Sequence, residues 1–186
     1  MDKRVIKTKK DIKDSFLKLL KEKNYNDITI NDILNESKIA RSTFYEHFKS
    51  KEDILSSLSE DIFIHITSNN LKKEDNHDFS SSNNFKDLLL HLLYHLYEEK
   101  DILNIIFKNE SRGTFLKLLH HSIIDLISSN EKELINDSKI PSSLTSKIVI
   151  IDIMNIIKWW IEIDNFNSTP NTILNYFEII SKEYIK

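Results

Sequence analysis

The sequence predicts an all-α protein, and three observations carry that prediction. The chain of 186 residues contains one glycine and two prolines, so the tight turns of β-hairpins lack the residues that they usually require. Pairs of the type Ser/Thr-x-x-Asp, which cap helix N-termini, precede several segments. In those segments apolar residues recur every three or four positions, which is the period of one helix face.

The first two helices are predicted from their caps. Thr8 begins the first such pair, and the apolar residues that follow it predict a helix over residues 9–23. A polar stretch then ends the apolar pattern. Thr29 begins the next pair and predicts a second, short helix over residues 30–37.

A third short helix is predicted over residues 41–47, and a longer one after it. On the third helix Phe44 and Phe48 fall on one side. Four residues remain for the opposite side: Arg41, Ser42, Tyr45 and Glu46. Ser50 begins another capping pair, and apolar residues at helical spacing continue from it into a fourth helix.

The second half of the chain is predicted to be helical after a connector. Residues 68–84 are rich in Ser, Asn and Asp, which is typical of a loop. Five further helices are predicted near residues 84–99, 101–108, 113–130, 141–165 and 170–184. We therefore expect three parts, which are a head (residues 1–50), a connecting helix (residues 51–72) and a helical body (residues 73–186).

Charge is unevenly distributed between head and body. Residues 1–51 contain 13 Lys and Arg against 8 Asp and Glu, whereas residues 52–186 contain 13 against 21, within a net charge of −3. A basic head on an acidic body predicts that the head meets a polyanion. An ordinary solvated lysine-rich surface is the alternative, and charge alone does not separate the two.

Several functions are excluded by the residue types that the chain lacks. One glycine cannot build a GxGxxG turn or a Walker phosphate loop. The absence of cysteine excludes disulfides, thiolate catalysis and cysteine-ligated metal centres, and it agrees with a cytoplasmic location. The N-terminal stretch lacks an apolar export signal, and polar residues interrupt the most apolar segment, residues 148–163, so we expect no membrane span.

Residues 29–51, TINDILNESKIARSTFYEHFKSK, combine two short helices, a tight turn and a capped longer helix. This segment resembles the helix-turn-helix of the TetR family of bacterial transcriptional regulators, and T-F-Y-x-H-F followed by K-S-K-E-D is its most specific part. KWWIEID and STPNTILNYF resemble the last two helices of a common C-terminal variant of that family. The resemblance implies a homodimer that binds a palindromic operator in double-stranded DNA, usually as a repressor released by a small-molecule effector.

The second short helix is expected to read DNA. A helix fits the major groove of B-DNA, where base edges present distinguishable donors and acceptors. Arg41 suits a forked contact to guanine O6 and N7, and Ser42 and Thr43 can reach a base edge or a phosphate. Tyr45 and His47 resemble the family positions that hydrogen-bond the DNA backbone.

Two residues outside that helix are expected to contact phosphates. Thr29 can cap its helix with its oxygen while its hydroxyl proton goes to a phosphate. Lys51 is unfavourable for the dipole of the helix that it begins, which suits a phosphate beside it. The basic residues near the N-terminus are interpreted either as a flexible arm along the DNA or as a solvated terminus: Arg4, Lys7, Lys9 and Lys10.

Three residues depart from the usual pattern of the family. Lys38 stands where glycine is usual in the turn, at a position that is often left-handed. Ala40 replaces the usual serine or threonine, so we expect no side-chain cap on the reading helix, a loss of about 1 kcal/mol. Glu46 repels phosphates unless it points to a cytosine or to solvent.

The body is expected to form the dimer. Residues 148–164 are apolar on all sides except for one narrow polar stripe, so this helix needs covering by its own core and by a partner chain. The expected dimer residues are Ile153, Ile157, Trp160, Phe177 and Ile180. Deep burial within one chain is the alternative.

The same region contains candidate residues for an effector cavity and for a metal site. The candidate cavity residues are Tyr94, His95, Phe107, Phe115 and Trp159, and plain core is the alternative for them. The pairs His91 with His95 and His120 with His121 have spacings that metal ligation allows, but no carboxylate falls at a matching spacing. We therefore expect no metal and no cofactor.

Two other functions remain as alternatives. A helical adaptor that binds protein and not DNA explains the apolar helices, but it leaves the polar side of residues 41–47 without a purpose. A di-iron enzyme needs two Glu-x-x-His pairs, and Glu74 with His77 supplies one pair within the polar connector. The sequence therefore favours a DNA-binding regulator and not an enzyme.

Overall fold

The computed structural model describes residues 3–67, 73–74, 77–78, 84–134, 140–182 and 185, with side chains left out at 64–67, 73–74, 77–78 and 132–134. Internal contacts divide the chain into two compact units, Met1–Leu58 and Ser59–Lys186. The division falls inside one helix, α4 (Lys51–Thr67).

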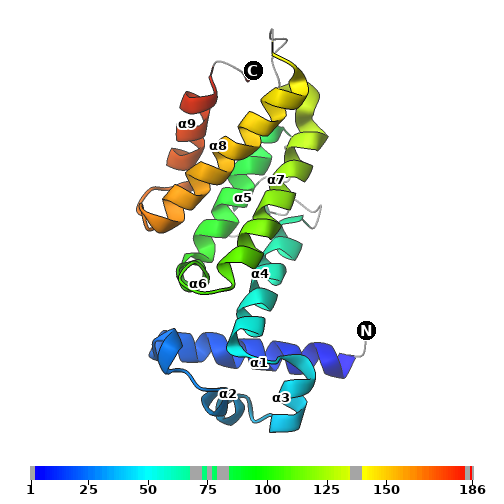
Figure 1. The fold of residues 1–186 in the computed structure, drawn as a ribbon, viewed down its shortest axis with the longest axis vertical. Helices are drawn as coiled ribbons and strands as arrows, with labels where there is room; N and C mark the ends of the chain where they lie inside the picture. The colour runs from blue at the N-terminus through cyan, green and yellow to red at the C-terminus, as the bar shows by residue number, and fades with distance from the viewer. Residues whose placement is uncertain are drawn as a thin grey trace. The chain divides into compact units, whose positions relative to one another are not determined.

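The first unit is a small helical cluster around one core. It contains α1 (Lys3–Glu22), a 3-10 turn η1 (Tyr25–Asp27), α2 (Ile30–Ser37), α3 (Arg41–His47) and the start of α4 (Figure 1). The bounds of α2 and α3 agree with the prediction. Its core consists of Ile12, Phe16, Leu19, Ile28, Ile33, Phe44, Phe48, Ile54, Leu55 and Leu58.

The first helix is longer than predicted. It begins at Lys3, so Thr8 lies inside it and does not cap it. No helix-breaking residue precedes Thr8, and lysine and arginine are good helix formers, so the helix continues back past the predicted start. The basic residues expected in a flexible arm therefore lie on α1, and the arm interpretation is wrong.

The second unit is a bundle. Its helices after α4 are α5 (Phe85–Glu98), α6 (Lys100–Ile106), α7 (Arg112–Leu134), α8 (Ser142–Glu162) and α9 (Pro170–Ser181). Figure 1 shows α5, α7, α8 and α9 side by side, and α5 and α8 each pack against both α7 and α9. The apolar faces of these four helices form the core of the unit.

The starts of these helices lie close to the predicted ones, and side chains cap two of them. The Asn84 side chain accepts a hydrogen bond from a backbone N–H of α5, and Thr169 does the same for α9 ahead of Pro170. Pro141 is the N-cap of α8, one residue before the predicted first helical position. The predicted end of α9 near residue 184 lies outside the described residues.

A short antiparallel pair lies within the predicted connector. β1 (Lys73–Glu74) pairs with β2 (His77–Asp78), and Glu74 is opposite His77. The side chains of Glu74 and His77, which the di-iron alternative uses, lie outside the description. Among the described helices, none combines the length and apolar character needed to cross a bilayer.

Candidate nucleic-acid interface

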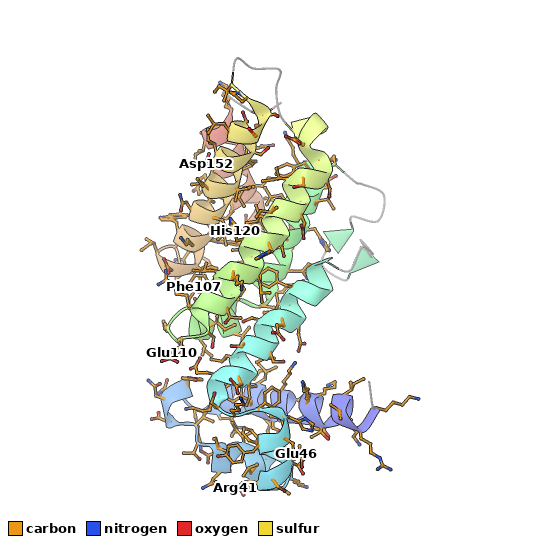
Figure 2. The ribbon with its side chains drawn as sticks, turned by 45° about the vertical axis from the view of Figure 1, so that its right-hand side comes forward. Arg41, Glu46, Phe107, Glu110, His120 and Asp152 are labelled. Atoms are coloured by element: carbon orange, nitrogen blue, oxygen red, sulfur yellow. The ribbon has the colours of Figure 1, made fainter. Side chains whose placement is uncertain are left out.

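The α3 helix exposes the polar side that the sequence predicts. Phe44 and Phe48 are buried, and their ring centroids lie 6.3 Å apart. The four residues predicted for the other side are exposed, namely Arg41, Ser42, Tyr45 and Glu46, while Thr43 and His47 are half-buried. Figure 2 shows Arg41 and Glu46 on the outer side of α3. The two phenylalanines anchor the helix so that its polar side remains available for a ligand.

The turn between α2 and α3 is left-handed at Lys38, although lysine replaces the glycine that is usual there. Lys38 has φ 57° and ψ 30°, a conformation that glycine adopts more easily than lysine. Ala40 precedes α3 without a side-chain cap, as expected from its methyl group, and its carbonyl accepts from the Phe44 N–H at 3.0 Å. The reading helix is therefore held mainly by core packing.

Thr29 and Asp32 form a complete capping box at the start of α2. The Asp32 N–H donates to Thr29 Oγ1 at 3.1 Å, and the Thr29 N–H donates to Asp32 Oδ2 at 2.8 Å. Thr29 also donates its hydroxyl proton to Asp32 Oδ2 at 2.8 Å. The proton that was expected to bind a phosphate therefore has a partner within the chain. Hydrogen bonds from the Thr29 backbone, the Thr29 hydroxyl and Lys23 lower the pKa of Asp32 to about 2.

Lys51 has an internal role that the sequence does not reveal. Its ammonium donates to the carbonyl oxygens of Tyr25 at 2.8 Å and Ile28 at 2.6 Å, and it lies 4.4 Å from the centroid of the Tyr25 ring. The Tyr25 hydroxyl also donates to the carboxylate of Glu52. Lys51 therefore fastens the segment before α2 to the start of α4, and this contact accounts for a cation at that helix end without any phosphate.

Arg41 is held by a residue that the sequence reasoning missed. Its Nη2 donates to Oδ1 of Asn31, which lies in the first turn of α2. Both side chains are exposed. Asn31 carries no signal in the sequence, because its contact with Arg41 depends on how α2 and α3 pack.

The five residues proposed for an effector cavity lie in different environments. Phe115 is fully buried, and its ring centroid is 5.1 Å from that of Phe63 and 5.4 Å from that of Phe107. Tyr94 accepts a hydrogen bond at its hydroxyl from Asn171 at 2.9 Å. Trp159 lies on α8 and is 40% exposed. The structure thus brings Phe107 and Phe115 together, whereas Trp159 is exposed, and helical spacing alone does not decide which neighbour each side chain meets.

Two of the histidines considered for metal binding are buried together. His91 and His95 place their Nε2 atoms 2.9 Å apart, and His95 Nδ1 lies 3.5 Å from a carboxylate oxygen of Glu98. His120 and His121 are exposed on α7, and Figure 2 labels His120. No group of three or more His, Cys, Asp or Glu within the described part of the chain has an arrangement that could hold a metal ion.

Most of the residues expected at a dimer interface lie in the core instead. Four of them are buried within their own chain: Ile153, Ile157, Trp160 and Phe177. Trp160 donates its indole N–H to the Ser168 carbonyl at 2.9 Å. Trp160 and Phe177 face α5, where their rings lie 5.9 Å from Tyr97 and 6.0 Å from Phe85, a direction that apolarity alone does not indicate. The prediction is therefore wrong for these four, and Ile180 is the member that is exposed.

A different apolar surface lies on the outer side of α8 and α9. Its exposed members are Ile151, Trp159, Ile163, Tyr176, Ile179 and Ile180, which we call the outer apolar face. A groove of about 450 Å³ crosses it, lined by Asn155, Ile156, Trp159, Tyr176, Ile179 and Ile180. The spacing of four residues between Ile151, Asn155, Trp159 and Ile163 is a sequence signal that could have predicted this side of α8.

A capped α2, a left-handed turn and an anchored α3 with an outward polar side define a helix-turn-helix DNA-binding protein. Comparison with known proteins agrees. Residues 14–58 match the family model described as bacterial regulatory proteins, tetR family. Residues 83–183 match the model of a transcriptional regulator C-terminal region. The chain belongs to the TetR family of bacterial regulatory proteins.

Individual relatives support the same assignment. The chain is 35% identical over 92 residues to DhaS of Lactococcus lactis, named as the dhaKLM operon transcriptional activator, covering 50% of this chain and 45% of that protein. It is 39% identical over 72 residues to the HTH-type transcriptional regulator YxbF of Bacillus subtilis, covering 36% of this chain and 19% of that protein. The matches thus span less than half the length of these curated relatives.

A solved structure extends the similarity to nearly the whole chain. A TetR transcriptional regulator from Streptococcus agalactiae has a TM-score of 0.64 and 26% identity, and the alignment covers 96% of each chain. The fold seen here, with its head and its C-terminal bundle, is therefore the fold of this family of regulators.

Proposed function

We propose that the protein is a homodimeric repressor that binds an inverted-repeat operator and is released by a small-molecule effector. The observation that carries the proposal is the pairing of an outward polar α3 with a separate outer apolar face. The α3 helix supplies a reader for one half-site. The outer apolar face supplies a surface whose exposure to water is unfavourable, as is typical of a protein–protein contact.

The proposed reader consists of the exposed and half-exposed residues of α3. Arg41 forks onto a guanine, Ser42 and Thr43 reach a base edge or a phosphate, and Tyr45 and His47 bind the DNA backbone. Each of these five residues keeps at least part of its side chain accessible. Thr29 and Lys51, by contrast, donate hydrogen bonds to groups of their own chain, so their phosphate contacts are the weaker part of the proposal.

The proposed dimer forms through the outer apolar face. Ile163 and Ile179 are 73% and 63% exposed, which is costly for large aliphatic side chains in water. Two copies of α8 and α9 that meet on this face form a four-helix interface with two-fold symmetry. That symmetry requires a palindromic operator, with the two readers about 34 to 36 Å apart if they occupy successive major grooves.

Repression and effector release are proposed on mechanical grounds. A dimer bound across a promoter blocks other proteins without needing a further contact surface, whereas activation needs one. An effector that favours a different separation of the two readers weakens operator binding by shifting the population away from the DNA-competent state. Because the relative DhaS is named as an activator, the sign of regulation requires its own test.

Selection of bound sequences from a random DNA pool tests the proposal most directly. We expect an inverted repeat whose half-sites are centred one helical turn apart, and its affinity should fall steeply between about 50 and 200 mM salt. Enrichment of a single asymmetric site contradicts the dimeric reader. Arg41→Ala should lose about 1 to 3 kcal/mol of binding and relax one base position in each half-site.

The oligomeric state and the sign of regulation are measured separately. Light scattering of the free protein at micromolar concentration should give the mass of two chains, and a monomer contradicts the dimer proposal. A reporter placed behind the selected operator should be expressed less when the protein is present. Higher expression contradicts repression while leaving DNA binding and dimerisation intact.

A further inference from the structure

The contact between Asn31 and Arg41 joins the first turns of the two short helices. Arg41 is the first residue of α3, and its Nη2 donates to Asn31 Oδ1 on α2. Asn31 itself lies inside the capping box formed by Thr29 and Asp32. That box holds the backbone on both sides of Asn31, so the Asn31 side chain starts from a fixed Cα position.

We infer that Asn31 is a positioning residue that sets the direction of the Arg41 guanidinium and thereby sharpens the preference for guanine. This inference rests on the proposed role of Arg41 as a base reader. A guanidinium has five N–H donors, so one bond to Asn31 leaves four. A forked contact to guanine O6 and N7 needs two of them, and the two functions are therefore compatible.

The physical benefit is that the Arg41 side chain is already ordered before the protein binds DNA. Arginine has a long side chain with many rotamers, and a free one loses that freedom when it contacts a base. Asn31 restricts the guanidinium while the protein is still free, so less freedom is lost on the operator. A wrong base gains nothing from this arrangement, because the fixed fork matches the geometry of guanine.

A double-mutant comparison tests the inference. Four proteins are compared: the wild type, Asn31→Ala, Arg41→Ala and the double variant. Each is titrated with the selected operator and with operators altered at the base that Arg41→Ala no longer discriminates. We expect Asn31→Ala to lower the guanine preference about 3- to 10-fold in the wild-type background, the range set by freezing one long side chain. In the Arg41→Ala background, Asn31→Ala should leave the base preference unchanged, because the side chain that Asn31 positions is absent.

Two further variants separate positioning from other effects. Asn35→Ala changes the same residue type one turn along α2, also exposed, and should keep the wild-type preference. Asn31→Asp retains an acceptor for Arg41, so it should keep the guanine preference while weakening binding to every operator through phosphate repulsion. Circular dichroism melting of each variant confirms that it is folded.

The outcomes distinguish the inference from the function on which it rests. An equal loss from Asn31→Ala in both backgrounds means that Asn31 contacts DNA by itself, and the positioning role is then overturned. An unchanged preference in Asn31→Ala overturns that role as well, while leaving Arg41 as the reader. If Arg41→Ala keeps the full guanine preference, the reader assignment in the proposed function fails, and the positioning role fails with it.

Discussion

Substitution of Lys51 distinguishes its internal role from a role in phosphate binding, because the two roles predict opposite changes in the free energy of unfolding. Lys51→Met keeps most of the apolar stem and removes the ammonium that bonds to the carbonyls of Tyr25 and Ile28. If the internal contacts matter, the free energy of unfolding of the first unit should fall. If Lys51 serves only a phosphate, removal of a cation from a helix N-terminus should leave stability unchanged or raise it by about 0.3 to 1 kcal/mol.

The magnitude follows from the contacts. Hydrogen bonds from a charged donor contribute roughly 1.5 to 3 kcal/mol each when buried, and the half-buried setting of Lys51 places both near the low end. The cation over the Tyr25 ring adds about 0.5 to 1 kcal/mol. Water reaching the freed carbonyls and relief of the helix dipole offset part of the loss. We therefore expect a net destabilisation of about 2 kcal/mol.

The assay is urea unfolding without DNA, followed by two signals. Both tryptophans, Trp159 and Trp160, lie on α8 in the second unit, so far-UV circular dichroism reports both units whereas tryptophan fluorescence reports the second. Lys51→Met should shift the dichroism transition and leave the fluorescence transition in place. Lys49→Met is the matched control, because it removes an exposed lysine two residues away. An unshifted transition for Lys51→Met refutes the internal role.

Three further predictions test the head and the outer apolar face. Ala40→Ser should supply the missing cap of α3 and raise the free energy of unfolding by about 1 kcal/mol in urea. The hydrogen bonds from Thr29 lower the pKa of Asp32 from an ordinary 3.8 to about 2, so its stabilising effect is complete above pH 4 and is lost as the pH falls through 2; acid unfolding of Asp32→Asn should lack this dependence. Ile163→Asp combined with Ile179→Asp should give a folded monomer in light scattering and weaken operator binding.

Each of these predictions has a result that contradicts it. A serine at position 40 that leaves the urea midpoint unchanged shows that the α3 N-terminus gains nothing from a cap. If Asp32→Asn and the wild type unfold in parallel between pH 4 and 2, the capping box does not lower the carboxyl pKa. For the dimer, Ile6→Asp is the control, since Ile6 is an exposed isoleucine of the first unit, and persistence of the dimer in the double variant excludes the outer apolar face.

Local signals were sufficient where the physical cause is local. The cap at Thr29 depends on residues within one turn of its helix, so its position follows directly from sequence spacing. The same reasoning placed Phe44 and Phe48 on the buried side of α3. It failed at Thr8, because a Ser/Thr-x-x-Asp pair marks a helix start only when the residues before it cannot be helical.

From the chain alone one can derive the helices and the polar side of α3, since each arises from contacts between residues a few positions apart. Packing decided the rest. It turned Trp160 and Phe177 inward and left Ile163 and Ile179 exposed, a choice that hydrophobicity does not make because all four are apolar. It also brought Lys51 to the carbonyls before α2 and Arg41 to Asn31, across separations in sequence that only the folded core closes.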